Sequence, residues 1–121
     1  MPYKNIEDQK KCVKQHYADN KAAYLVRAIA GRAKTRAAII EFVVAYLRCH
    51  PCVDCGEADI VVLEFDHRDA AEKCFTIGKT LTGNLVGLER VKSEVAKCDV
   101  RCANCHRRKT SIDGGWYRAL L

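Results

Sequence analysis

Two CxxC pairs are the residues of this 121-residue chain whose types and spacing point most directly to chemistry. The first pair is Cys52 and Cys55, and the second is Cys102 and Cys105. Four thiolates saturate one Zn²⁺ tetrahedrally and leave no open position, so a zinc ion held by them would be structural. A redox-active CxxC is the alternative, but the presence of two such pairs favours metal binding. We therefore predict a structural zinc at these four cysteines.

The residue that follows Cys55 helps to choose the pairs. Gly56 suits a tight knuckle in which backbone N–H groups turn toward the sulfur atoms, and this favours Cys52 with Cys55 over Cys49 with Cys52. The chain has eight cysteines, so four remain. We expect each of the remaining four to be a small buried hydrophobe rather than a ligand: Cys12, Cys49, Cys74 and Cys98.

A second group of acid, base and ligand types lies between and after the pairs. Asp66 and His67 follow an apolar run, and His106 follows the last Cys directly. Residues 51–66 contain five acids and no Lys or Arg, so this segment attracts cations. Residues 97–109 contain five Lys or Arg and one acid, so this segment suits a phosphate group near His106. Asp66 and His106 can supply two ligands to a divalent cation, and His67 can act as general base. Each residue alone is more often structural, as a turn, a cap or a partner of a carbonyl.

This layout resembles the HNH endonuclease family, whose fold is called beta-beta-alpha-metal. The resembling pieces are CVDC, EFDH and CANCHRRKT, and they span roughly residues 49–112. The resemblance implies a metal-dependent DNA endonuclease that nicks or cuts DNA by phosphodiester hydrolysis, with Asp66 and His106 as metal ligands and His67 as base. The catalytic cation would be Mg²⁺, Mn²⁺ or Ni²⁺, and it would polarise the scissile phosphate. Such proteins are frequent in bacteriophages, which implies double-stranded DNA and the phage packaging machinery as partners.

The sequence departs from the family pattern at two places. The middle Asn of the family lies several residues before the second CxxC, but residues 95–99 read VAKCD and contain no Asn. Asn104, inside the second CxxC, is our candidate for that role, bracing the loop from the helix start. The usual Pro and Gly after Asp-His are replaced by residues 68–71, which read RDAA.

The expected fold class is α+β, with an N-terminal helical arm (1–48) and a small zinc-bound beta-beta-alpha-metal core (49–121). Periodicity of three and four predicts helices over residues 6–17, 21–48 and 84–97. A β-branched run predicts a strand at 60–65, with a short extended piece at 74–77 and a second strand at 99–101. The last helix starts at Cys102 and ends at Gly114, and an apolar tail follows at 116–121.

The net charge of +6 lies in the first part of the chain. Residues 1–50 hold ten Lys or Arg against four acids, whereas residues 51–121 hold eleven of each. Arg32 and Arg36 fall inside the apolar arc of the second helix and repel each other, so we expect an exposed section that bends at Gly31. We favour phosphate contact over a merely solvated face. The DNA-contacting candidates are Arg27, Arg32, Lys34, Arg36, Arg101, Arg107 and Arg108.

Composition also bears on location and on a second function. The chain has no run of about 18 apolar residues, so no membrane span is expected. Residues 1–11 lack an apolar stretch of the secretory type, so we expect a cytoplasmic protein, in the host cell if it is phage-encoded. The alternative function is a zinc-stapled DNA-binding or packaging accessory without hydrolysis. Such a module has no need of Asp66, His67 and His106 together.

Overall fold

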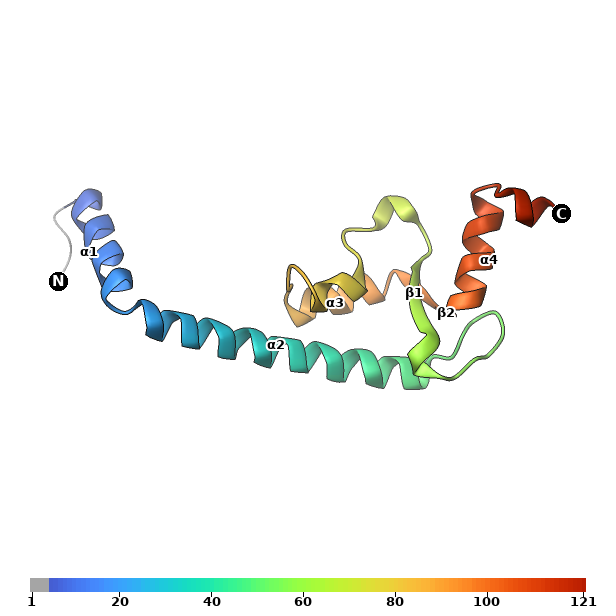
Figure 1. Ribbon diagram of the computed structural model, residues 1–121, viewed down its shortest axis with the longest axis horizontal. Coiled ribbons are helices and arrows are strands. Elements are labelled where there is room, and N and C mark those ends of the chain that lie inside the picture. The colour runs from blue at the N-terminus through green and yellow to red at the C-terminus, as the bar shows by residue number, and fades with distance from the viewer. Residues whose placement is uncertain (1–4) are drawn as a thin grey trace. The chain divides into compact units, whose positions relative to one another are not determined.

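The described chain is a mixed α and β protein with a small antiparallel sheet. The structure is a computed structural model, and it describes residues 5–121. Figure 1 shows the order of the elements: α1 (Ile6–Asp19), α2 (Lys21–Cys49), β1 (Leu63–His67), α3 (Leu88–Val95), β2 (Cys98–Cys102) and α4 (Ala103–Asp113). Short 3₁₀ turns stand between them and in the C-terminal tail. None of the helices in this described part is long and apolar enough to cross a membrane.

Packing divides the chain into two units, one ending at Lys34 and the other comprising Thr35–Leu121. In the first unit, the Asn5 side chain accepts a hydrogen bond from the Asp8 N–H (2.8 Å) and so caps α1. The rings of Tyr17 and Tyr24 contact each other at 5.2 Å between centroids. No residue of α1 is buried. The helix α2 begins in this unit and continues without interruption through Gly31 to Cys49.

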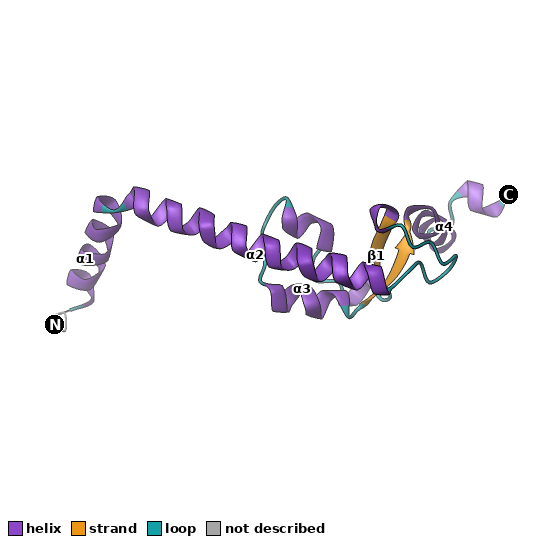
Figure 2. Ribbon diagram, turned by 90° about the horizontal axis from the view of Figure 1, so that it is seen from below, coloured by secondary structure: helices purple, strands orange, loops and turns teal. Residues whose placement is uncertain are grey.

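The two strands pair antiparallel, with Leu63 opposite Cys102 and His67 opposite Cys98. The first strand begins later than the predicted residue 60, because residues 60–62 form a 3₁₀ turn in which the Asp59 side chain accepts a hydrogen bond from the Val61 N–H. It then continues through His67, so Asp66 and His67 lie within the strand. The second strand is also longer than the predicted 99–101. Figure 2 shows the strands, in orange, in the second unit.

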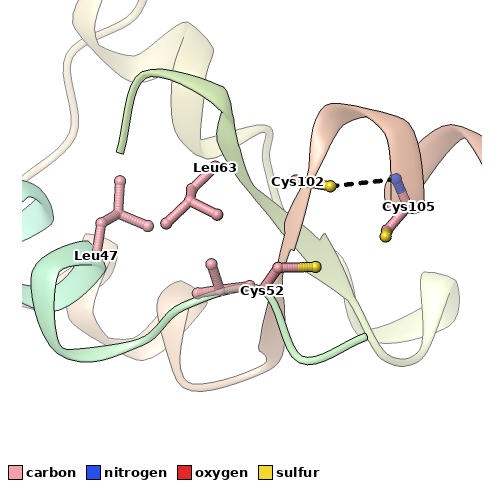
Figure 3. Packing of buried hydrophobic residues seen from close by; sticks show 6 residues of the cluster. Leu47, Cys52, Leu63, Cys102 and Cys105 are labelled. Atoms are coloured by element: carbon pink, nitrogen blue, oxygen red, sulfur yellow. Dashed lines mark hydrogen bonds between the residues drawn. The ribbon is translucent and has the colours of Figure 1, made fainter. Parts of the chain in front are cut away.

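Two buried clusters hold the second unit together, and the last turns of α2 contribute to both. Leu47 packs with Leu63 of β1, Val100 of β2 and three of the zinc-candidate cysteines (Figure 3). Ile39, which is fully buried, packs with residues of α3 and of the loop between the strands. The C-terminal end of α2 therefore packs on the core of the second unit.

The insertion between the strands differs most from the sequence-based expectation. Residues 74–77 form no strand, and 3₁₀ turns lie at Ala70–Glu72 and Ile77–Leu81. The helix predicted over 84–97 is limited to Leu88–Val95, and Gly87 is its N-cap. The preceding Leu85 and Val86 pack on the Ile39 cluster as loop residues. Glycines at 83 and 87 bracket this segment and lower its helix propensity.

The prediction that the four remaining cysteines are buried is right only for Cys98. Cys12, Cys49 and Cys74 are exposed. The reasons are local: α1 buries none of its residues, Cys49 is the last residue of α2, and Cys74 lies in the loop between the strands.

Candidate functional site

The four predicted zinc ligands come together in the second unit. The Sγ atoms of Cys52, Cys55, Cys102 and Cys105 all lie within 4.8 Å of one another. The Cys55 and Cys102 sulfurs are 3.7 Å apart, and a Zn–S bond of about 2.3 Å in a tetrahedron requires sulfur separations of about 3.8 Å. The donor set and its spacing therefore fit a tetrahedral metal ion. In the described residues this is the one group of at least three Cys, His, Asp or Glu side chains so arranged.

Backbone geometry shapes both halves of this cysteine cluster. Gly56 has φ of +79°, a left-handed conformation that glycine adopts without strain, and its N–H donates to the Cys52 carbonyl at 2.9 Å. The prediction of a tight turn at Gly56 is thus confirmed. On the other side, Cys102 is the N-cap of α4, and its sulfur accepts from the Cys105 N–H at 3.4 Å. The cluster therefore joins the loop after α2 to the junction of β2 and α4.

The pKa values of the thiols differ because their surroundings differ. Burial tends to raise the pKa of Cys52, but backbone N–H groups of Cys102, Cys55 and Asp54 outweigh it and lower the pKa to about 6. The Cys102 side chain and burial raise the pKa of Cys105 to about 12. A metal ion bound by four thiolates must therefore displace protons from this cluster.

A histidine and two carboxylates form a second group, at the contact of β1 with α4. Glu64 and Asp66 lie two residues apart on β1 and so on one face of it. His106 Nδ1 lies 2.6 Å from Glu64 Oε2, and its Nε2 lies 3.5 Å from Asp66 Oδ1. Two ligand atoms, each about 2.1 Å from a shared ion, have a similar separation. The Asp66 and His106 side chains are therefore spaced as two ligands of one cation would be.

Glu64 is a member of this group that the sequence analysis missed. A carboxylate only accepts hydrogen bonds, so the Nδ1 of His106 carries the hydrogen in this contact. Nε2, the other ring nitrogen, is the one that lies near Asp66. Carboxylates commonly fix the tautomer of a metal-binding histidine in this way. The signal in the sequence was the spacing of Glu64 two residues before Asp66.

Two cations also contact Asp66. Arg101 Nη1 lies 2.8 Å from Asp66 Oδ2, and Lys109 Nζ lies 3.8 Å from the same atom. Arg101 also donates to Asp54 at 2.8 Å, and only 11% of its side chain is exposed. Arg101 therefore lies within a network of acids, whereas its predicted role was DNA contact.

His67 is held from the other side by a buried glutamate. Its Nε2 lies 2.6 Å from Glu94 Oε1, and Glu94 also accepts from the Cys74 N–H and from Lys97 Nζ, both at 3.0 Å. Burial alone would raise the pKa of Glu94, but these donors lower it to about 2. Glu94 is therefore ionised at neutral pH, so it accepts the hydrogen bond and Nε2 of His67 carries the hydrogen in this contact.

Glu94 was not predicted, although the pattern held a signal for it. It stands between Val91 and Val95 on the buried stripe of α3, where a charged residue needs partners. Lys97 lies only three positions away, but Cys74 and His67 lie 20 and 27 positions away in the chain. Such a pairing depends on the tertiary fold and not on local spacing.

One pocket brings the candidate catalytic residues together. It measures about 750 Å³, and Glu64, Asp66, His67 and His106 line it together with apolar residues of α2. This acidic pocket, as we name it, lies wholly in the second unit. Asn104 is not among its lining residues: it lines a different pocket, with Arg107, Arg108 and the C-terminal tail. The structure thus groups three of the four predicted catalytic residues.

The basic candidates on α2 are all exposed. Arg27 stacks over the Tyr24 ring at 5.1 Å, and Arg32, Lys34 and Arg36 lie on the surface of the helix. Exposure is what the repulsion between Arg32 and Arg36 predicted. Comparison with models of known protein families, with curated protein sequences and with solved structures finds no match to this chain.

Proposed function

We propose that this protein is a metal-dependent DNA endonuclease with an HNH-type core, using one divalent cation and a histidine base. The observation that carries the proposal is the pairing of two carboxylate–histidine contacts in one pocket. Glu64 orients His106 toward Asp66, and Glu94 orients His67. All of these except Glu94 line the acidic pocket. A structural zinc site needs neither the buried Glu94, which orients the base, nor the exposed Glu64, which orients a metal ligand.

Each side chain has a definite task in this proposal. Asp66 Oδ1 and His106 Nε2 would hold the cation, which supplies polarisation of the scissile phosphate and stabilisation of the leaving 3′-oxygen. Glu64 keeps the hydrogen of His106 on Nδ1. His67 takes a proton from the attacking water on Nδ1, and the Glu94 carboxylate stabilises the resulting imidazolium.

The cysteine cluster would hold a structural zinc ion. Four thiolates leave no coordination position for substrate, so this ion would take no part in hydrolysis. It would fix α4, and with it His106, against β1, which carries Asp66. Zinc binding would then contribute directly to the folding free energy of the second unit.

DNA is the substrate that the charge distribution favours. The net charge of +6 and the exposed cations of α2 suit a polyanion. Arg107 and Arg108 add exposed cations on α4, the helix that carries His106. Double-stranded DNA, a phage packaging partner and the host cytoplasm remain parts of this proposal that the family resemblance suggests.

A second candidate function has one observation in its favour. Arg101 and Lys109 already neutralise Asp66 Oδ2, so the network could be a purely structural set of ion pairs. The protein would then be a zinc-stapled DNA-binding or packaging accessory. The two candidates differ in whether Asp66 and His106 bind a divalent cation.

The distinguishing experiment is nicking of a supercoiled plasmid by the zinc-loaded protein. We expect no cleavage without added divalent metal and cleavage with Mg²⁺, Mn²⁺ or Ni²⁺. Asp66→Asn should require more metal for the same rate, whereas Asp69→Asn, a nearby exposed aspartate that caps a 3₁₀ turn, should behave as wild type. Failure of every metal to support nicking, with zinc and fold intact, would leave the accessory function.

A further inference from the structure

The C-terminal tail folds back on α4, and two glycines make this possible. Gly115 has φ of +65°, in the left-handed region. A Cβ on Gly114 would lie 3.0 Å from Trp116 Nε1, so glycine leaves room for the indole beside the helix end. The Trp116 N–H donates to the Ser111 carbonyl at 2.9 Å and fixes the turn. Figure 1 shows this tail, in dark red, after the turn at the end of α4.

The turn builds a pocket that the proposed hydrolysis does not use. It measures about 560 Å³, and we name it the tail pocket. Its lining combines positive charge with aromatic rings and includes no acidic residue among the described ones: Arg107, Arg108, Arg118, Trp116, Tyr117 and Asn104. Both rings are open to solvent, Trp116 at 46% and Tyr117 at 69% relative exposure. None of these three arginines forms an ion pair with an acidic residue of the described chain, so exposed aromatic rings and positive charge stand together here, as on a binding surface.

The two rings are not equivalent. The Arg118 guanidinium lies over the Tyr117 ring at 5.6 Å, and its Nε donates to the Tyr117 hydroxyl at 2.9 Å. One face of Tyr117 is therefore occupied by a cation. Trp116 has no such cation over it in the described residues, so its indole is the better stacking platform.

A continuous surface joins the tail pocket to the acidic pocket. A smaller depression of about 440 Å³ lies between them. It shares Arg107 and Trp116 with the tail pocket, and Glu64 and His106 with the acidic pocket. A ligand that reaches His106 can therefore extend along α4 to Trp116.

We propose that the tail pocket binds an unpaired nucleotide of a DNA strand, with its base stacked on Trp116 and its phosphates on Arg107, Arg108 and Arg118. Stacking needs an open base face, which a base paired within a duplex does not offer, and aromatic platforms beside a basic groove are how proteins hold single strands. The Asn104 amide can donate and accept hydrogen bonds at the edge of the base. An acidic peptide would use the arginines but leave the rings without a partner.

This inference deepens the proposed function, on which it rests for the identity of the strand. It implies that the preferred substrate carries an unpaired segment beside the scissile phosphate, as gapped or tailed DNA does. It also gives Asn104 a role in strand binding, in place of the predicted bracing of the catalytic loop. The binding itself can be measured without cleavage, so the two proposals can fail separately.

Trp116 is the one tryptophan of the chain, so its fluorescence reports directly on the tail pocket. The full-length, zinc-loaded protein is titrated, without added divalent metal, with an oligothymidylate, with an abasic oligomer of equal length and with a blunt hairpin duplex. We expect strong quenching by the oligothymidylate alone. Equal quenching by the abasic oligomer would mean that only phosphate is bound. If the oligothymidylate binds but does not quench the fluorescence of Trp116, the strand binds elsewhere on the protein. Either result would overturn the proposal.

Variants give a second, independent measure through the anisotropy of a labelled oligothymidylate. Trp116→Leu should weaken binding roughly 5- to 150-fold, the range expected for loss of one stacked base, and Trp116→Phe should retain most of the affinity. Arg118→Ala should weaken binding more than Arg90→Ala, a matched loss of one exposed charge on α3. Zinc content and circular dichroism verify the fold, and Trp116→Phe keeps the test valid if Trp116→Leu does not fold. Wild-type affinity in a folded Trp116→Leu would reject the stacking role.

Cleavage assays separate this proposal from the endonuclease proposal. If oligothymidylate quenches Trp116 fluorescence but no DNA is cleaved, strand binding at the tail pocket is supported and the endonuclease proposal fails. If plasmid is cleaved but Trp116 does not respond to oligothymidylate, the endonuclease proposal stands and the tail pocket is not a strand site.

Discussion

Glu64 Oε2 and His106 Nδ1 lie 2.6 Å apart, although 42 residues separate them in the chain. This contact fixes which nitrogen of His106 faces Asp66, and it therefore decides whether the pair can bind a metal ion. A hydrogen bond between a carboxylate and a charged or metal-bound imidazole is among the stronger ones in proteins.

Loss of the Glu64 carboxylate should weaken divalent metal binding without removing a ligand. We expect Glu64→Gln to lower the Mn²⁺ affinity of the acidic pocket by roughly 10- to 100-fold, as loss of such an orienting partner commonly does. Isothermal titration with Mn²⁺ on zinc-loaded protein measures this affinity. Glu57→Gln, which removes a carboxylate of the loop after Cys55, is the matched control. Unchanged affinity in Glu64→Gln would mean that His106 does not bind the ion through Nε2.

The cysteine cluster should be required for the fold of the second unit. Cys52→Ser and Cys105→Ser should each lose bound zinc and the cooperative thermal transition, because the binding energy of a structural zinc ion is largely folding energy. Cys12→Ser, at an exposed cysteine outside the cluster, should keep both. The measurement is zinc per chain together with Tm. A Cys105→Ser protein that retains its zinc and its Tm would contradict the four-cysteine assignment.

Glu94 should make stability depend on pH in a defined direction. Its pKa is lowered from 4.5 to about 2 in the folded protein, so its contribution is complete above pH 4.5 and is lost as the pH falls toward 2. We expect Glu94→Gln to destabilise the protein at pH 7 by about 1–3 kcal/mol, since His67, Lys97 and the Cys74 N–H lose an ionised acceptor.

Urea unfolding of wild type and of Glu94→Gln across this pH range tests the prediction. The difference in unfolding free energy should be constant from pH 7 to about pH 4.5 and should shrink below it. Metal loss in acid affects both proteins and cancels in the difference. A difference that stays constant down to pH 3 would show that Glu94 is not held ionised by its partners.

The exposed arginines of α2 should contact phosphates without reading sequence. Each phosphate contact contributes about −0.9 to the slope of log K against log salt concentration. Arg32→Ala combined with Arg36→Ala should therefore weaken binding to all duplexes alike and flatten the slope by roughly two units. Arg90→Ala combined with Lys92→Ala removes equal charge from α3 and should leave the slope unchanged. If both double variants behave alike, the DNA surface lies elsewhere, with Arg107 and Arg108 of α4 as the first alternatives.

Local spacing was enough to predict some parts of this protein. The cysteine set follows from ligand spacing and from Gly56, and the last helix from its start at the second pair. The ends of the elements were less predictable. Asp59 caps a 3₁₀ turn, so β1 begins three residues later than predicted, and Leu85 and Val86 pack on the core from a loop rather than from a helix.

The hydrogen-bond partners of His67 and His106 could not be predicted, for a physical reason. Glu64 reaches His106 across the contact of β1 with α4, and Glu94 reaches His67 from the insertion between the strands. Both contacts depend on how elements distant in sequence pack together. The tail pocket was not predicted for the same reason. The sequence shows Trp116 and Tyr117 only as part of an apolar tail, whereas the turn at Gly114 and Gly115 places both rings beside α4.

The central claim is that His67 is the base of a hydrolytic site, and His67→Ala tests it most directly. Glu94 keeps Lys97 and the Cys74 N–H as partners in this variant, so fold and zinc content should persist. We predict that plasmid nicking with saturating metal falls about 100-fold or more, whereas His16→Ala, at an exposed histidine of α1, nicks at the wild-type rate. A folded, zinc-loaded His67→Ala protein that nicks as fast as wild type would contradict the account.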